Sequence, residues 1–189
     1  MTTSLASVIV IGASAGALEA LSTILPALPA GYPFAVLIVV HVPPDKKSVL
    51  AELFRSKCQI RVVEVEDKEP ISAGTVYFAP PDYHVLVEAD LTLALSTEEP
   101  VLFSRPSIDV LFESAADALG PAVTAIVLSG ANQDGSIGLR AVVDAGGTAI
   151  VQDPDHAFAA AMPEGAIYAC PEAEIMSLEA IRSYLQGMS

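Results

Sequence analysis

The sequence predicts an α/β fold: three α/β/α layers around a doubly wound, mostly parallel sheet, with a β-hairpin-like middle segment. Apolar runs that suit fully buried strands alternate with segments of helical periodicity, which is typical of parallel sheets covered by helices on both faces. The composition agrees, because 52% of the residues are hydrophobic and only 17% are charged. At 189 residues without a break in composition, the chain is expected to form a single domain over residues 1–189.

The first half of the chain follows the order strand, helix, strand, helix, strand. Its apolar runs and helical segments place strands at 8–11, 36–40 and 60–65 and helices at 17–28 and 46–56. The middle is rich in β-forming residues, and strands are expected there at 75–79, 84–87 and 91–95. The breaks between them, at 80–82 and 88–90, have the composition of turns, so this part is expected to be hairpin-like.

The second half returns to alternating helices and strands. Residues 107–119 have helical spacing of their apolar side chains, with Pro106 near the start and Gly120 and Pro121 at the end. The pattern then predicts a buried strand at 123–128, a helix at 137–145, a strand at 148–151 and a last helix at 178–185.

The charge balance and the cysteines exclude several classes of function. With 23 acidic and 9 basic residues and a net charge of −14, the chain is a poor partner for nucleic acid. No apolar stretch reaches the ~18–20 residues of a membrane span, and the N-terminus lacks the features of a signal peptide. Cys58 and Cys170 do not have metal-ligand spacing. We therefore expect a cytoplasmic protein with no metal, no cofactor and no direct membrane insertion.

Ser14 is the centre of a G-x-S-x-G motif, Gly12 to Gly16, that stands between the first strand and the first helix. In this context the glycines allow a sharp turn that raises the serine hydroxyl from the end of the strand. The unpaired amides that open the following helix lie beside it. Ser14 is therefore a candidate nucleophile. The alternative is a glycine-rich turn in which Ser14 only caps the helix.

Two further polar residues follow predicted strands. His41 comes directly after 36–40, and Asp134 lies a few residues after 123–128. If these strands are parallel neighbours of the first, Ser14, His41 and Asp134 emerge at the same edge of the sheet, where ligand sites form. A histidine there would accept the proton of the serine, and the aspartate would orient the imidazole. The order Ser, His, Asp differs from that of the α/β-hydrolases.

Each member of this set has a purely structural alternative. His41 could hydrogen-bond a loop carbonyl, and Asp134 could form a turn or cap the helix at 137–145. The other histidines compete for the role of base. His84 opens a strand-like segment in the middle region, and His156 lies in a polar loop.

Several ordered blocks of sequence make the chain recognisable. It resembles the catalytic domain of the chemotaxis protein-glutamate methylesterases, the CheB-type family, over nearly its whole length. The blocks are 11–16 (IGASAG), 40–43 (VHVP), 76–81 (VYFAPP) with His84, 105–112 (RPSIDVLF), 128–135 (LSGANQDG) and 162–167 (MPEGAI).

The resemblance implies a function and a set of roles. Ser14 would be the nucleophile, His41 the general base and acid, and Asp134 the orienting carboxylate. The reaction would be hydrolysis of glutamate methyl esters on chemoreceptor-like protein helices, with deamidation of receptor glutamines as a related activity. Backbone amides at Ala15 and Ala131 would stabilise the oxyanion. The family's N-terminal receiver domain is not expected here, and the oligomeric state is left open.

The chain departs from the family pattern beside the predicted nucleophile and in the Asp134 loop. Ala15 stands where the family usually has threonine, and Asn132 where it has glycine. Asn132 is a candidate for the substrate cleft, together with Met162 and with Arg105 as a source of local positive charge; Arg140 is a second candidate for that charge.

Two other functions are kept open by the sequence. One is an esterase or amidase that uses the same triad on a different substrate. The other is a non-catalytic binding module in which the Gly12–Gly16 turn holds an anion at the helix N-terminus. The turn lacks both G-x-G-x-x-G and G-K-[ST], so a nucleotide is a poor candidate for that anion.

Overall fold

A parallel sheet of seven strands forms the centre of the computed structural model, which describes residues 7–43 and 48–188. Strand β1 (Val8–Ala13) lies in its interior, between β2 (Ala35–Val40) and β8 (Val123–Val127), and all pairings in the sheet are parallel. The order is β10-β9-β8-β1-β2-β5-β3, where the remaining strands are β3 (Arg61–Glu64), β5 (Thr75–Phe78), β9 (Thr148–Gln152) and β10 (Glu174–Met176).

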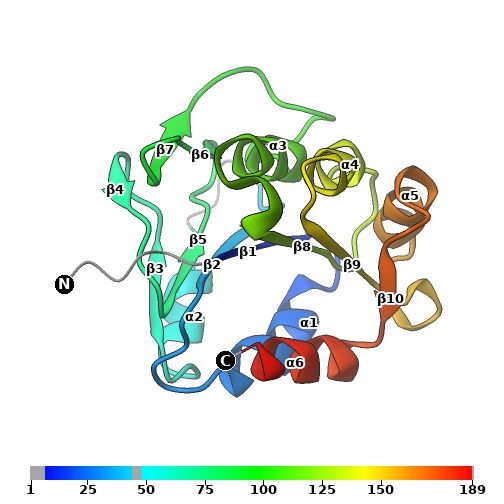
Figure 1. Ribbon diagram of the computed structural model, residues 1–189, viewed down its shortest axis with the longest axis horizontal. Helices are drawn as coiled ribbons and strands as arrows, with labels where there is room; N and C mark the ends of the chain where they lie inside the picture. The colour runs from blue at the N-terminus through cyan, green and yellow to red at the C-terminus, as the bar shows by residue number, and fades with distance from the viewer. Residues whose placement is uncertain (1–6, 44–47, 189) are drawn as a thin grey trace.

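Helices cover both faces of this sheet (Figure 1). Helices α3 (Ile108–Leu119), α4 (Ser136–Asp144) and α5 (Ala161–Ala169) pack on one face, and α1 (Ala17–Ile24), α2 (Leu50–Arg55) and α6 (Leu178–Gly187) pack on the other. Successive residues of β1 point to opposite faces, so that Val8 and Val10 join the first core and Ile9 and Ile11 the second. This confirms the predicted three layers.

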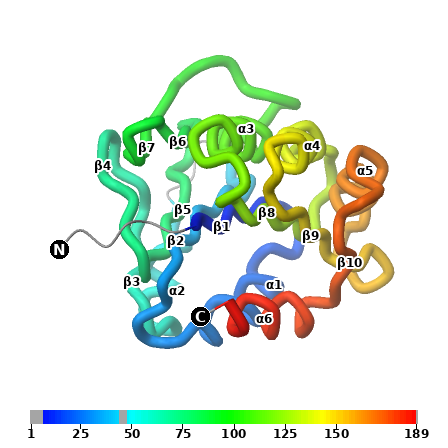
Figure 2. Tube along the Cα trace, in the orientation of Figure 1, coloured from blue at the N-terminus to red at the C-terminus, as the bar shows by residue number. Residues whose placement is uncertain are grey.

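The predicted hairpin is also confirmed. Strands β6 (His84–Val87) and β7 (Thr92–Ser96) pair antiparallel, and β4 (Glu69–Pro70) adds to β7 to give a sheet of order β4-β7-β6. Figure 2 shows this small sheet beside α3, at one side of the molecule. The expectation of a hairpin-like region is wrong for 75–79, because β5 belongs to the parallel sheet, between β2 and β3.

Several elements differ from their predicted bounds. The helix expected at 17–28 ends at Ile24, and a 3₁₀ turn (Leu25–Ala27) containing Pro26 follows it. The helix expected at 46–56 begins at Leu50; residues 46 and 47 lie outside the described residues. Further 3₁₀ turns occupy Gly120–Ala122 and Pro154–His156.

Helix α5 and the short strands β4 and β10 were not predicted. Helix α5 contains Pro163 and Gly165, which are poor helix formers, so local propensity argues against it. Its buried residues Met162 and Ala166 pack into the same core as α3 and α4. Helix α5 therefore forms because of its tertiary packing, despite its low local helix propensity. Among the described residues no helix is long and apolar enough to cross a membrane.

Helices α3 and α4 approach closely at Gly138. A Cβ atom built on Gly138 would lie 2.6 Å from Cβ of Phe112 and 3.0 Å from the backbone oxygen of Asp109. Neither neighbour is the flexible end of a side chain, so a larger residue would have to push the two helices apart. This contact sets the distance between the helices that carry the site described below.

We expect Gly138→Ala to lower the free energy of unfolding by about 1–3 kcal/mol, the usual cost of overpacking. Gly187→Ala in α6 is the matched control, because nothing lies within 4 Å of a Cβ built there. Urea denaturation of both variants measures the difference. Equal stability of the two variants would show that the α3–α4 contact tolerates a methyl group.

Candidate active site

Three chain segments meet at the carboxyl edge of the parallel sheet, the edge at which its strands end. Ala13 pairs with Val40, and the amide of His41 donates to the oxygen of Ala13 at 3.2 Å. The amide of Ser14 donates to the oxygen of Ser129 at 2.9 Å. Strand β1 therefore brings Ser14 between the segments that follow β2 and β8, as predicted. The strands that follow β1 in the sequence, β2, β3 and β5, lie on one side of β1, and β8, β9 and β10 lie on the other. The order of strands thus reverses at β1, and ligand-binding sites of α/β sheets form at such a switch point.

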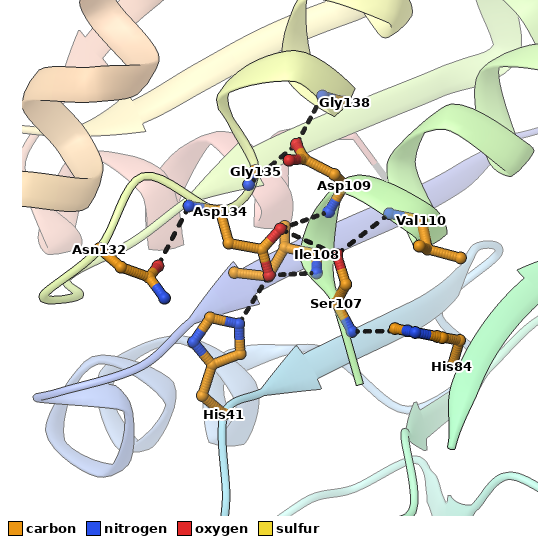
Figure 3. Close-up of polar contacts among 10 residues, drawn as sticks. All are labelled: His41, His84, Ser107, Ile108, Asp109, Val110, Asn132, Asp134, Gly135 and Gly138. Atoms are coloured by element: carbon orange, nitrogen blue, oxygen red, sulfur yellow. Dashed lines mark hydrogen bonds and ion pairs between the residues drawn. The ribbon is translucent and has the colours of Figure 1, made fainter. Parts of the chain in front are cut away.

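His41 contacts Asp134 directly. Its Nε2 lies 2.7 Å from Oδ2 of Asp134, and the side chain of His41 is 12% exposed while that of Asp134 is fully buried. Because Nε2 faces a carboxylate, this nitrogen carries the proton, and Nδ1 is left as the acceptor of the neutral ring. Figure 3 shows Nδ1 directed away from Asp134. The histidine is thus held in one tautomer.

The carboxylate of Asp134 also receives three hydrogen bonds from the start of α3 (Figure 3). The amide of Ile108 donates to Oδ2 at 2.7 Å, and the amide of Asp109 and the hydroxyl of Ser107 donate to Oδ1, each at 2.9 Å. Burial alone would raise the pKa of Asp134, but the hydrogen bonds from His41 and from the two amides outweigh it and lower the pKa. Asp134 therefore stays ionised beside His41.

Asp109 forms the reciprocal contact from α3 to α4. Its Oδ1 accepts from the amides of Gly135 at 2.9 Å and Gly138 at 2.7 Å (Figure 3). Its Oδ2 is buried and has no hydrogen-bond partner among the described residues. Burial, with the nearby charge of Asp134, raises the pKa of Asp109 to about 6. Each helix start is thus capped by an acidic residue from the neighbouring segment.

A second layer of contacts fixes Ser107. Ser107 is the N-cap of α3, and its amide donates to Nδ1 of His84 at 3.1 Å. Nε2 of His84 donates to the oxygen of Glu99 at 3.0 Å, so neither ring nitrogen of this buried histidine is available to act as a base. The roles of Ser107 and Asp109 were not predicted from the sequence. A serine directly before the helical pattern at 108 was the available sign of an N-cap.

The hydroxyl of Ser14 makes no hydrogen bond to His41 or to any other described residue. The side chain is half-buried.

Within the described residues, the amides of Ala15 and Ala131 have no hydrogen-bond acceptor either, whereas the amide of Ser14 donates to the oxygen of Ser129. Gly16 has φ of 85°, and Phe158 occupies the space in which a side chain at position 16 would lie. His156 is exposed and contacts Asp153.

A cleft of about 340 Å³ opens at His41. Arg105 lies in its wall, and each of its guanidinium nitrogens already donates within the protein: Nε and Nη2 donate to Asp82, and Nη1 donates to the oxygens of Thr97 and Glu98. The cleft is lined by His41, Val42, Pro43, Asp82, Pro100, Phe103, Ser104, Arg105 and Pro106.

The other two cleft candidates lie outside this lining. Oδ1 of Asn132 accepts from the amide of Asp134 at 3.1 Å and so shapes the loop. Met162 is fully buried against Gly130, and its amide donates to the oxygen of that residue. Arg140 in α4 is paired with Asp144 and Glu172. Among the described residues no group of three or more His, Cys, Asp or Glu side chains could hold a metal ion.

Comparison with known proteins identifies the family. The family model of CheB methylesterase matches residues 9–185. The chain belongs to the CheB methylesterase family. This confirms the resemblance drawn from the sequence blocks and makes the chain an ester hydrolase by family.

Relatives agree with this assignment. A protein of Leptospira interrogans with the provisional name protein-glutamate methylesterase/protein-glutamine glutaminase is 44% identical over 173 residues, 92% of this chain and 90% of that protein. A protein-glutamate methylesterase/protein-glutamine glutaminase of Chromohalobacter salexigens is 37% identical over 94% of this chain, which spans 51% of that protein. The crystal structure of the Thermotoga maritima CheB methylesterase catalytic domain superposes with a TM-score of 0.93 at 29% identity, covering 97% of this chain and 98% of that domain.

The raised pKa of Asp109 predicts a pH-dependent difference between wild type and Asp109→Asn. The folded protein binds this proton more tightly than the unfolded chain, so the contribution of Asp109 to the free energy of unfolding falls as the pH rises from about 4 to about 6.5. Asparagine retains the Oδ1 acceptor for both glycine amides but cannot ionise. The variant should therefore gain stability relative to wild type over this range, by at most about 3 kcal/mol.

Urea denaturation at several pH values measures this gain. Asp117→Asn removes a carboxylate from the exposed side of the same helix and controls for the loss of one charge. If the curves of wild type and Asp109→Asn ran parallel with pH, the proposed titration of Asp109 in the folded protein would be excluded.

Proposed function

We propose that this chain hydrolyses methyl esters of glutamate side chains on chemoreceptor-like protein helices, with Ser14 as nucleophile, His41 as general base and acid, and Asp134 as the orienting carboxylate. The contact between His41 and Asp134, at the sheet edge that also carries Ser14, is the observation that carries the proposal. Membership of the CheB methylesterase family and the names of the relatives supply the substrate class.

The proposed reaction is acyl transfer in two steps. Nδ1 of His41 takes the proton of the Ser14 hydroxyl as Oγ attacks the ester carbonyl carbon. The tetrahedral intermediate collapses, the bond to the methoxy oxygen breaks, and His41 returns the proton so that methanol leaves. Water, deprotonated by the same nitrogen, then attacks the acyl-serine and releases the glutamate carboxylate and the free serine. The Ser14 hydroxyl makes no hydrogen bond to His41 in this structure, and such bonds often tighten only with substrate bound.

The environment of Asp134 suits the role of orienting carboxylate. The imidazolium that forms during each proton transfer needs a negative charge beside Nε2. Asp134 supplies that charge because hydrogen bonds keep its pKa low although it is buried. In the chymotrypsin arrangement the aspartate binds Nδ1 and the serine faces Nε2; in the proposed site the two ring nitrogens exchange these roles.

The amides of Ala15 and Ala131 are the proposed donors to the oxyanion. Both lie in segments joined by the hydrogen bond between Ser14 and Ser129, and neither has an acceptor among the described residues. The amide of Ser14 is excluded from this role because Ser129 occupies it. Ala15 also precedes α1, whose positive end favours an anion. A family change from threonine to alanine at 15 leaves this backbone donor intact.

The same machinery would release ammonia in place of methanol from a glutamine side chain, since both reactions pass through a tetrahedral oxyanion. The names of the relatives include this glutaminase activity. We also propose a cytoplasmic location, which the unpaired state of Cys58 and Cys170 favours.

Ser14→Ala and His41→Ala should each abolish methanol release from a methylated chemoreceptor fragment, with losses in kcat of up to ~10⁶-fold because triad members act together. Ser136→Ala is the matched control, since its hydroxyl is buried at the start of α4 and has no hydrogen-bond partner among the described residues. Release of labelled methanol is the measurement, with labelling by a serine-directed covalent probe as a second readout. Normal turnover in the Ser14 variant would refute the mechanism.

Asp134→Asn should reduce kcat by about 10⁴-fold, because it removes the charge that stabilises the imidazolium and the acceptor that selects the tautomer. Asparagine would also turn an NH₂ group toward N–H or O–H donors that now bind the carboxylate. The variant is therefore compared at a temperature where circular dichroism shows it folded. A folded Asp134→Asn protein with wild-type kcat would contradict the role proposed for Asp134.

A further inference from the structure

A two-residue turn presents apolar side chains beside the candidate active site. Val101 and Ser104 exchange backbone hydrogen bonds of 3.0 and 2.8 Å, and Leu102 and Phe103 lie between them. Both tip residues have left-handed backbones, with φ of 48° and 64°. Asparagine and glycine are the usual occupants of such a turn, because larger side chains are strained there. We call Leu102 and Phe103 the apolar tip.

Packing within the described chain does not explain the apolar tip. Leu102 is 51% exposed, and Phe103 is 102% exposed, so its whole ring faces solvent. Fold stability alone would favour small or polar residues at both positions. Two large apolar side chains on a strained turn are therefore better explained by contact with another molecule.

The base of the turn is held firmly. Arg105 binds Asp82 with Nε and Nη2 at 3.0 and 2.6 Å, and its Nη1 donates to the backbone oxygens of Thr97 and Glu98. His84 binds the oxygen of Glu99. The segment between β7 and α3, which arches above α3 in Figures 1 and 2, is thus tied down on both sides of the turn. The apolar tip is presented on a fixed support.

The position of the apolar tip relates it to the reaction. Phe103 lines the same cleft as His41, and the neighbouring wall residues Val42, Pro43 and Pro106 are also apolar. Other exposed apolar side chains lie at the same carboxyl edge, among them Leu18 and Ile137 in the first turns of α1 and α4. Tyr168 in α5 and Ile175 in β10 are also exposed, outside the lining of the cleft at His41.

The charge of the chain restricts what can bind here. At −14 the protein cannot attract an acidic helix by long-range charge. The guanidinium of Arg105, the one arginine or lysine in the described lining of the cleft, is paired with Asp82. The methyl ester itself is uncharged, so apolar contact around the ester is the interaction that the described lining favours.

We propose that the apolar tip is the element that docks the ester-bearing helix, by inserting Leu102 and Phe103 against apolar side chains of that helix next to the methylated glutamate. This inference rests on the proposed methylesterase function. It adds a specificity element that is separate from the proposed triad.

The double variant Leu102→Asn/Phe103→Gly tests this inference. Asn-Gly favours the same turn, so the support should be kept while both apolar side chains are lost. Two substrates are compared: a coiled-coil chemoreceptor fragment carrying labelled glutamyl methyl esters, and N-acetyl-glutamate γ-methyl ester. We expect kcat/KM for the fragment to fall by about tenfold or more, through KM, with the small ester unaffected. Tyr168→Ser, which removes an aromatic ring that is 90% exposed and outside the lining of the His41 cleft, is the matched control and should change neither.

Each other outcome overturns the inference in a distinct way. Unchanged activity on the fragment shows that the apolar tip does not dock the helix, and an equal loss on both substrates shows that it supports the site itself. Self-association of wild type that the double variant lacks, seen by sedimentation, assigns the apolar tip to a second copy. If the wild-type protein hydrolyses the small ester but not the fragment, the proposed substrate fails and the docking role fails with it. Hydrolysis of neither would refute the proposed function.

Discussion

The architecture of the candidate site depends on one buried carboxylate, that of Asp134. An ionised carboxylate without exposure is expensive unless donors replace its water shell. Here four donors do so, from His41, Ser107 and the amides of Ile108 and Asp109. The same contacts fix three things at once: the start of α3, the loop after β8 and the ring of His41. The hydrogen bonds that stabilise the fold at this point are therefore the same ones that orient the proposed base.

Asp109 extends this arrangement into the contact between α3 and α4. Asp134, just before α4, caps α3, while Asp109 in α3 caps α4 through Gly135 and Gly138. Two acidic side chains are thereby brought close together, and Asp109, which has fewer hydrogen-bond donors than Asp134, has the raised pKa. In a preorganised site of this kind the cost of burying and orienting the charged groups is met when the protein folds. Little reorganisation of these groups is then needed during the reaction step.

The sequence predicted those parts of the site that follow from strand ends. The apolar runs at 8–11, 36–40 and 123–128 located β1, β2 and β8, and parallel pairing then required residues after them to share an edge. The contacts of Ser107, His84 and Asp109 could not be predicted in this way, because they join segments that are distant in the sequence and depend on how α3 packs. Arg105 illustrates the same limit: its charge was visible, but its pairing with Asp82 required the fold.

The acidic character of the chain favours release of the proposed product. The ester of the proposed reaction is neutral, whereas its product is a carboxylate formed in a protein of net charge −14. In the cleft wall Asp82 already occupies the guanidinium of Arg105, so the described lining offers the product no free cation. Coulomb repulsion would then weaken binding of the product but not of the ester, while apolar contacts would hold both equally. Apolar contacts can therefore bind the ester while charge repulsion promotes release of the carboxylate product. The two effects are separate contributions to the binding free energy, and an acidic enzyme with an apolar cleft can use both.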